Sequence, residues 1–71
     1  MNLLDVVVLT QDRPELGLRA GQVGTIVEVY SSDEFEVEFV NRQTGRTYAI
    51  ETFTAKEILK LIYEPVSMPA A

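Results

Sequence analysis

Apolar and polar residues alternate along several short segments of this chain, and turn-forming residues separate the segments. Residues 25–30 and 35–40 alternate in the way typical of strands that bury one face. Residues 6–10 form a continuous β-branched run, which predicts a buried strand. Two further strands are expected at residues 46–52 and 59–63, so five short strands account for most of the chain.

The segments between these strands are rich in turn formers. Residues 11–21, QDRPELGLRAG, hold one proline and two glycines among polar residues and predict a long irregular loop. The runs SSD at 31–33 and NRQTG at 41–45 predict tighter reversals. Thr54 and Glu57 have the spacing of a capping box, which predicts one helical turn before the last strand.

The hairpin of the third and fourth strands has a favoured register. Pairing Phe39 with Tyr48 and Val37 with Ile50 places four apolar side chains on one face. It leaves RQTG as the loop, with Gly45 free to adopt a left-handed conformation. A slip by one residue would move Tyr48 and Ile50 to the opposite face, so this register is the prediction.

The same alternation predicts an acidic outer face. If Phe35 and Phe39 point inward, the glutamates at 34, 36 and 38 point outward. The predicted register sets Glu36 opposite Glu51, a like-charge pair that costs some tenths of a kcal/mol and that apolar burial outweighs. We expect a candidate docking surface for a basic partner protein, formed by Ile26, Glu28, Tyr30, Glu36, Glu38 and Glu51. The alternative is a solvated face that only discourages edge-to-edge aggregation.

Length and composition limit how this protein is stabilised. Its 71 residues allow one domain, expected over residues 1–64 with a flexible tail at 65–71. A chain this short buries only about 60% of the surface that its unfolded form exposes. It has no cysteine and no histidine, which excludes disulfides and the usual zinc ligands, so no metal or cofactor is predicted. The 46% hydrophobic fraction supports tight packing and leaves room for self-association into a homo-oligomer.

The order of the predicted elements indicates an all-β fold. Five short strands, a long first loop, tight hairpins and one helical turn before the last strand are typical of a small SH3-like barrel. The rival architecture is a five-stranded barrel of the oligonucleotide-binding type, which usually has more residues and a longer helix.

Two resemblances start from GLRAGQVGTIVEVY, residues 17–30. Residues 5–29 resemble the KOW motif, in which a strand, a glycine-bearing loop and a second strand open an SH3-like barrel. The blocks LLDVVVL, DRPELGLRAGQVGTIVEVY, FEVEFV and GRTYAIETF, within residues 3–61, resemble a bacterial family known only as domain of unknown function 4926. That resemblance implies a small, stand-alone barrel-like protein, and it assigns no catalytic or binding residue.

The chemistry-bearing residues argue against several classes of function. Gly21 and Gly24 precede a strand and not a helix, so they predict positive φ or close backbone approach instead of a phosphate loop. Without histidine or cysteine the common general base and nucleophile are missing, and no enzyme is predicted. The net charge of −5 disfavours nucleic acid, although a KOW-like nucleic-acid-associated module is the alternative function. No apolar run approaches the roughly 20 residues of a membrane span, so a cytoplasmic location is the default expectation.

Overall fold

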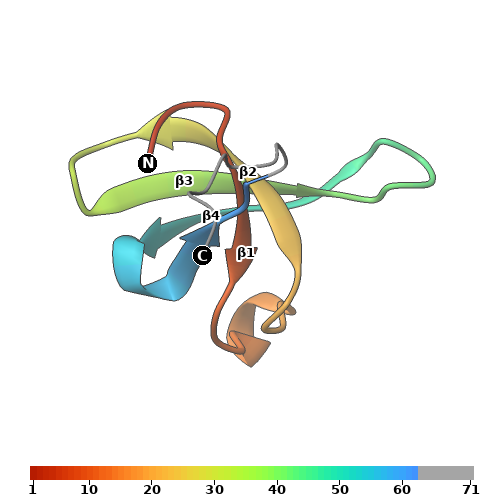
Figure 1. The fold of residues 1–71 in the computed structure, drawn as a ribbon. Helices are drawn as coiled ribbons and strands as arrows, with labels where there is room; N and C mark the ends of the chain where they lie inside the picture. The colour runs from red at the N-terminus through yellow and green to blue at the C-terminus, as the bar shows by residue number, and fades with distance from the viewer. Residues whose placement is uncertain (63–71) are drawn as a thin grey trace, which may run out of the picture.

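The computed structural model describes residues 1–62, which form one antiparallel sheet. The five strands are β1 (Val6–Leu9), β2 (Val23–Val29), β3 (Glu34–Val40), β4 (Thr47–Thr54) and β5 (Ile58–Lys60). Two 3-10 turns, η1 (Pro14–Leu16) and η2 (Ala55–Glu57), lie in the first loop and before β5. The strand order β4-β3-β2-β1-β5 places β4 and β5 at the two edges of a strongly curved sheet (Figure 1).

The predicted all-β class, the five strands and the helical turn before the last strand are confirmed. The first loop additionally holds η1, which starts at Pro14 and is followed by Gly17 in a left-handed conformation (φ 71°). The last strand begins one residue earlier than predicted and ends at Lys60. Tyr63, the predicted end of that strand, and the predicted tail at 65–71 lie outside the described residues.

Nine buried apolar side chains form one core on the inner face of the curved sheet. Phe35 and Phe39 point inward, as the alternation of β3 predicts. Phe39 also meets Phe53 edge to face, with ring centroids 5.9 Å apart. Leu18 is the one member that comes from the irregular loop, and it anchors that loop on the sheet. The complete core consists of Val7, Leu9, Leu18, Ile26, Phe35, Val37, Phe39, Phe53 and Ile58.

The predicted register of the β3–β4 hairpin is confirmed next to its loop. The amide of Asn41 donates a hydrogen bond to the carbonyl of Arg46 over 2.8 Å, which leaves RQTG as a four-residue loop. Gly45 adopts the expected left-handed conformation, with φ 73°. Val40 then pairs with Thr47, in the predicted alignment.

Beyond that point the predicted register is wrong, because β4 contains a β-bulge at Tyr48. Phe39 faces Ala49, and Val37 faces Glu51, so the pairing is shifted by one residue. The shift also sets Phe53 opposite Phe35, where both rings are buried. In the predicted register Phe53 would have pointed to the outer face, so the bulge gains the burial of a large ring.

The bulge places Tyr48 and Ile50 differently. The Tyr48 ring still contacts Phe39, with centroids 6.3 Å apart, although the side chain is 51% exposed. Its hydroxyl accepts a hydrogen bond of 2.8 Å from the side-chain amide of Gln22, which connects β4 to the start of β2. Ile50 lies on the outer face and is 47% exposed.

Glycines act as the sequence predicts at the start of β2. Gly21 has a φ of 95°, and Gly24 lies where β2 crosses closely over β3. A Cβ built on Gly24 would meet Val37, the Glu38 carbonyl and Phe39 at less than 3.0 Å. The close approach lets the β2–β3 pair curve tightly around the core.

An ion pair ties the first loop to η2. The Arg13 guanidinium donates hydrogen bonds to Glu57 and, over 3.0 Å, to Glu15, and it lies 5.5 Å from the Phe53 ring centroid. Glu57 also forms the predicted capping box, accepting the Thr54 amide over 2.9 Å. Burial acts to raise the pKa of Glu57, but the hydrogen bonds from Thr54 and Arg13 outweigh it, so this pKa lies below its ordinary value.

Candidate functional site

Three glutamates form an acidic row on the outer face of β2 and β3. We call Glu28, Glu36 and Glu38 the acidic row. Glu28 lies directly opposite Glu36, and Glu38 follows two residues further along the same face of β3. The strands β2, β3 and β4 contain no lysine or arginine, so the row has no cation on its own strand or on the strands beside it. The row therefore gives this face a negative potential.

Hydrogen-bond donors flank the acidic row. The Thr47 hydroxyl donates to a carboxylate oxygen of Glu38 over 2.5 Å. Tyr30 lies at the other end of the row and is exposed. The carboxylate of Glu36 raises the pKa of the Tyr30 phenol, because it favours the protonated hydroxyl as a donor. Tyr30 thus presents a neutral aromatic ring beside the carboxylates.

The structure brings four of the six predicted docking residues together and separates two. Glu28, Tyr30, Glu36 and Glu38 share the outer face, as expected. The predicted outward position of Ile26 is wrong, because its side chain is 0% exposed in the core.

A β-bulge in β2 explains the position of Ile26. Ile26 pairs with Val37, whereas Glu28 pairs with Glu36, so Val27 is an extra residue. The extra residue lets Ile26 point inward while Glu28 still points outward. Strict alternation cannot place both of them correctly, because residues 26 and 28 would then share one face.

The bulge in β4 explains the position of Glu51. The predicted pairing of Glu51 with Glu36 is wrong, since Glu51 lies opposite Val37 on the inner side of the edge strand, where it is half-buried. Thr52 occupies the position opposite Glu36 instead. The like-charge contact predicted for Glu36 is made with Glu28.

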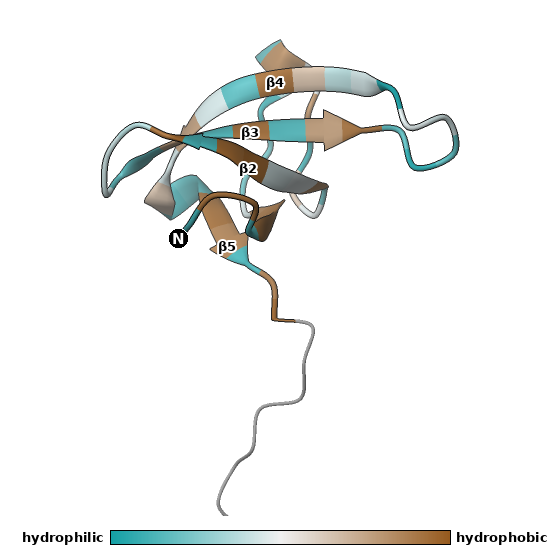
Figure 2. Ribbon diagram, turned by 90° about the horizontal axis from the view of Figure 1, so that it is seen from above, coloured by the Kyte–Doolittle hydropathy of each residue, from teal (hydrophilic) through white to brown (hydrophobic). Residues whose placement is uncertain are grey.

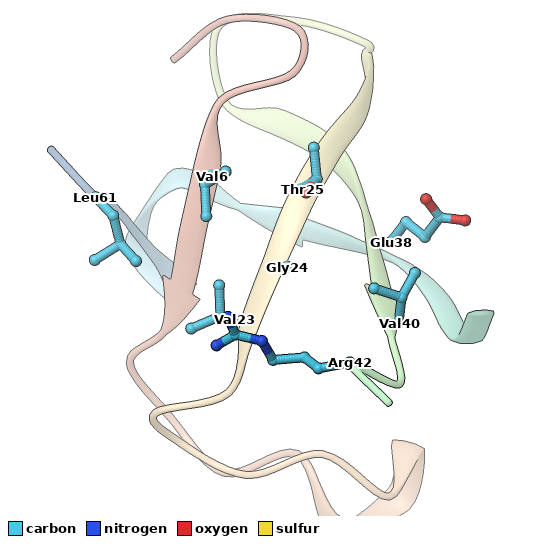
Figure 3. Close-up of a pocket in the computed structure, with 8 residues that line it drawn as sticks. All are labelled: Val6, Val23, Gly24, Thr25, Glu38, Val40, Arg42 and Leu61. Carbon is cyan, nitrogen blue, oxygen red and sulfur yellow. The ribbon is translucent and has the colours of Figure 1, made fainter. Parts of the chain in front are cut away.

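An apolar hollow of about 310 Å³ lies beside the acidic row. We call it the apolar hollow, and its apolar walls are formed by Val6, Val23, Val40 and Leu61 (Figure 3). Leu61 reaches this face because its amide donates to the Val6 carbonyl over 2.8 Å, continuing the pairing of β5 with β1. The sequence contained one signal for it: β1 is apolar at every position, so its outer face is apolar too.

Charged side chains border the apolar hollow on two sides. Glu38 belongs to both the acidic row and the rim of the hollow. Arg42 extends from the β3–β4 loop back toward Val23 (Figure 3). Figure 2 shows hydrophilic and hydrophobic positions alternating along β3. Exposed apolar side chains with a charged rim are typical of protein-docking surfaces.

Other kinds of site find little support in the described part of the chain. Within residues 1–62, no cluster of three or more potential metal ligands is brought together. None of the helical segments in that range is long and apolar enough to cross a membrane.

Comparison with known proteins gives one finding. A family model described as "Domain of unknown function (DUF4926)" matches residues 3–60. No curated protein and no solved structure matches the chain. The family description assigns no activity, ligand or partner.

Proposed function

This chain belongs to the DUF4926 family, whose function is unknown, and we propose that it is a non-enzymatic protein-docking module. The proposal rests on the surface features of this chain. The partner is a basic protein that contacts the apolar hollow and the acidic row together. The hollow supplies buried contact area, and the carboxylates attract and orient a positively charged partner.

The observation that carries this proposal is the position of the apolar hollow directly beside the acidic row. Val23 and Val40 are exposed on the outer face of the sheet, where β2 begins and β3 ends. Most of these side chains lie on hydrogen-bonded strands of the sheet, so both features are in place before any partner arrives. The net charge of −5 adds a long-range attraction for basic partners.

Neutralising the acidic row tests the proposal. The double variant Glu36→Gln and Glu38→Gln should bind the partner about tenfold more weakly, because two attractive charges are lost. The partner is first captured from lysate by the wild-type protein and identified by mass spectrometry. Its affinity for each variant is then measured by calorimetry.

A charge-matched control separates a local from a general effect. The variant Gln11→Lys and Glu15→Gln changes the net charge by +2, from −5 to −3, as the glutamine double variant does. Both positions are exposed, and both lie in the first loop, which does not line the hollow. Equal weakening by the two variants would show that only net charge matters, and would remove the acidic row from the proposal.

The proposal includes self-association as a form of docking. Both β4 and β5 are edge strands, which a second copy can cover. Light scattering of the purified protein measures whether it self-associates in the absence of a partner protein. A mass that stays monomeric at high concentration removes self-association and leaves the partner protein.

A further inference from the structure

The edge strand β4 carries only two of the features that usually protect a sheet edge, a bulge at Tyr48 and the inward-pointing Glu51. It is eight residues long, and within residues 1–62 it pairs only with β3. Natural edges are commonly short or carry lysine, proline or a bulge. The sequence of β4, TYAIETFT, has no lysine or proline, and its bulge lies near its start at Tyr48. The opposite edge, β5, is three residues long and ends in Lys60.

The hydrogen-bonding pattern shows which groups of β4 point away from β3. The Ala55 amide donates to the Asp33 carbonyl over 3.2 Å, so this position forms a hydrogen-bonded pair. Such pairs alternate along an antiparallel ladder, so the odd-numbered residues of the regular part of β4 bond to β3. The N–H and C=O groups of Ile50 and Thr52 therefore point outward from the sheet edge.

Thr54 provides an independent check of this alternation. Its N–H should also point away from β3, and it donates to the Glu57 carboxylate over 2.9 Å. That contact ends the free edge on one side, and the bulge at Tyr48 ends it on the other. The open segment covers residues 49–53.

The surroundings of this segment specify the charge of an added strand. On the outer face Thr52 lies opposite Glu36 and Ile50 opposite Glu38. A strand added to β4 would lie about two strand spacings, roughly 10 Å, from β3. Lysine and arginine side chains pointing to the outer face can span that distance to meet the carboxylates, passing over the small Thr52. A second copy paired through its own β4 would add its acidic row to the same outer face, where like charges repel.

We infer that residues 49–53 of β4 accept an extended basic segment of the partner protein as a sixth strand. Main-chain hydrogen bonds to Ile50 and Thr52 supply the pairing, and alternate lysine or arginine side chains face Glu36 and Glu38. This inference rests on the proposed function for the basic character of the partner, and it adds the way in which the partner binds.

The test uses a synthetic peptide in which arginine and valine alternate. Hydrogen exchange measured by NMR should show the Ile50 and Thr52 amides protected when the peptide binds, since they become hydrogen-bonded. A second peptide, N-methylated at alternate amides, should bind about tenfold more weakly, because it cannot form the ladder. Equal affinity of the two peptides, or no new protection at these amides, would overturn the inference without the need for any protein variant.

A pair of variants at one position gives the complementary test. Thr52→Pro removes the outward N–H and should weaken peptide binding by about tenfold, because one main-chain hydrogen bond to the peptide is lost. The variant should still fold, since edge strands tolerate proline where the N–H faces solvent. Thr52→Val keeps the N–H and should bind within about twofold of the wild type.

The outcomes distinguish this inference from the proposed function. If Thr52→Pro binds the peptide normally while Glu36→Gln with Glu38→Gln does not, docking stands and strand addition is wrong. If Thr52→Pro instead converts a dimer to a monomer in light scattering, the edge is occupied by a second copy and the basic occupant is wrong.

Discussion

Replacing Gly24 with alanine should lower the free energy of unfolding by about 3 kcal/mol, because β3 fills the space that a methyl group would need. The added Cβ would lie 2.6 Å from Cγ1 of Val37 and 2.9 Å from the carbonyl oxygen of Glu38. The valine side chain can rotate, but the carbonyl belongs to the backbone of a central strand. Either β2 or β3 has to move, and the core beneath them loses contacts. Urea denaturation at neutral pH measures the effect.

A second glycine serves as the control for this variant. Gly17 has a φ of 71°, and a Cβ there would meet no atom within 4 Å. Gly17→Ala should therefore lower the free energy of unfolding by only about 1 kcal/mol, the cost of holding a residue with a Cβ in the left-handed conformation. If Gly24→Ala is no more destabilising than Gly17→Ala, the close approach of β2 and β3 does not limit the side chain at position 24.

Glu57→Gln should lower the free energy of unfolding by about 2 kcal/mol at neutral pH, the second largest effect that we predict. The variant leaves the half-buried Arg13 guanidinium without its ion-pair partner in η2. It also weakens the acceptor for the Thr54 amide in the capping box. Thermal denaturation followed by circular dichroism measures the loss. Glu15→Gln is the control: this carboxylate binds the same arginine but is 60% exposed, so water screens the pair and its removal should leave the stability nearly unchanged.

The contribution of Glu57 should depend on pH in one direction. Its pKa is lower in the folded protein than the ordinary value of about 4.3 in an unfolded chain. The stabilisation is therefore complete above that ordinary value and is lost as the pH falls through the folded pKa. The difference in stability between the wild type and Glu57→Gln should shrink below about pH 4. Parallel pH profiles for the two proteins would contradict a role for the ionised carboxylate.

Strand β3 was predictable in detail because its alternation is uninterrupted. Phe35, Val37 and Phe39 face the core, and the glutamates between them face outward. The neighbours of β3 each contain a bulge, at Val27 and at Tyr48, and each bulge reverses the expected face of nearby residues. Bulges have no reliable local signal. They arise here because the core gains Ile26 and Phe53, a benefit that depends on the whole fold.

The candidate site was predictable to the extent that β3 was. The acidic row follows directly from the alternation around Phe35 and Phe39. The apolar hollow does not, because it combines Val6, Val23 and Val40 from three strands with Leu61, which follows the last strand. Local patterns cannot report such a combination. The burial of Leu18 in the core was not predicted for a related reason, since the loop that carries this residue has no hydrophobic periodicity.

The position of β1 between a neighbour in sequence and the last strand has a consequence for folding. This strand lies between β2 and β5, so one of its two edges is covered by residues 58–61. Contacts between such distant segments close late, because the intervening chain must first be ordered. A nascent chain that ends before β5 exposes an open strand of four consecutive aliphatic residues. Partly folded forms in which β5 has not yet paired should therefore be prone to aggregation.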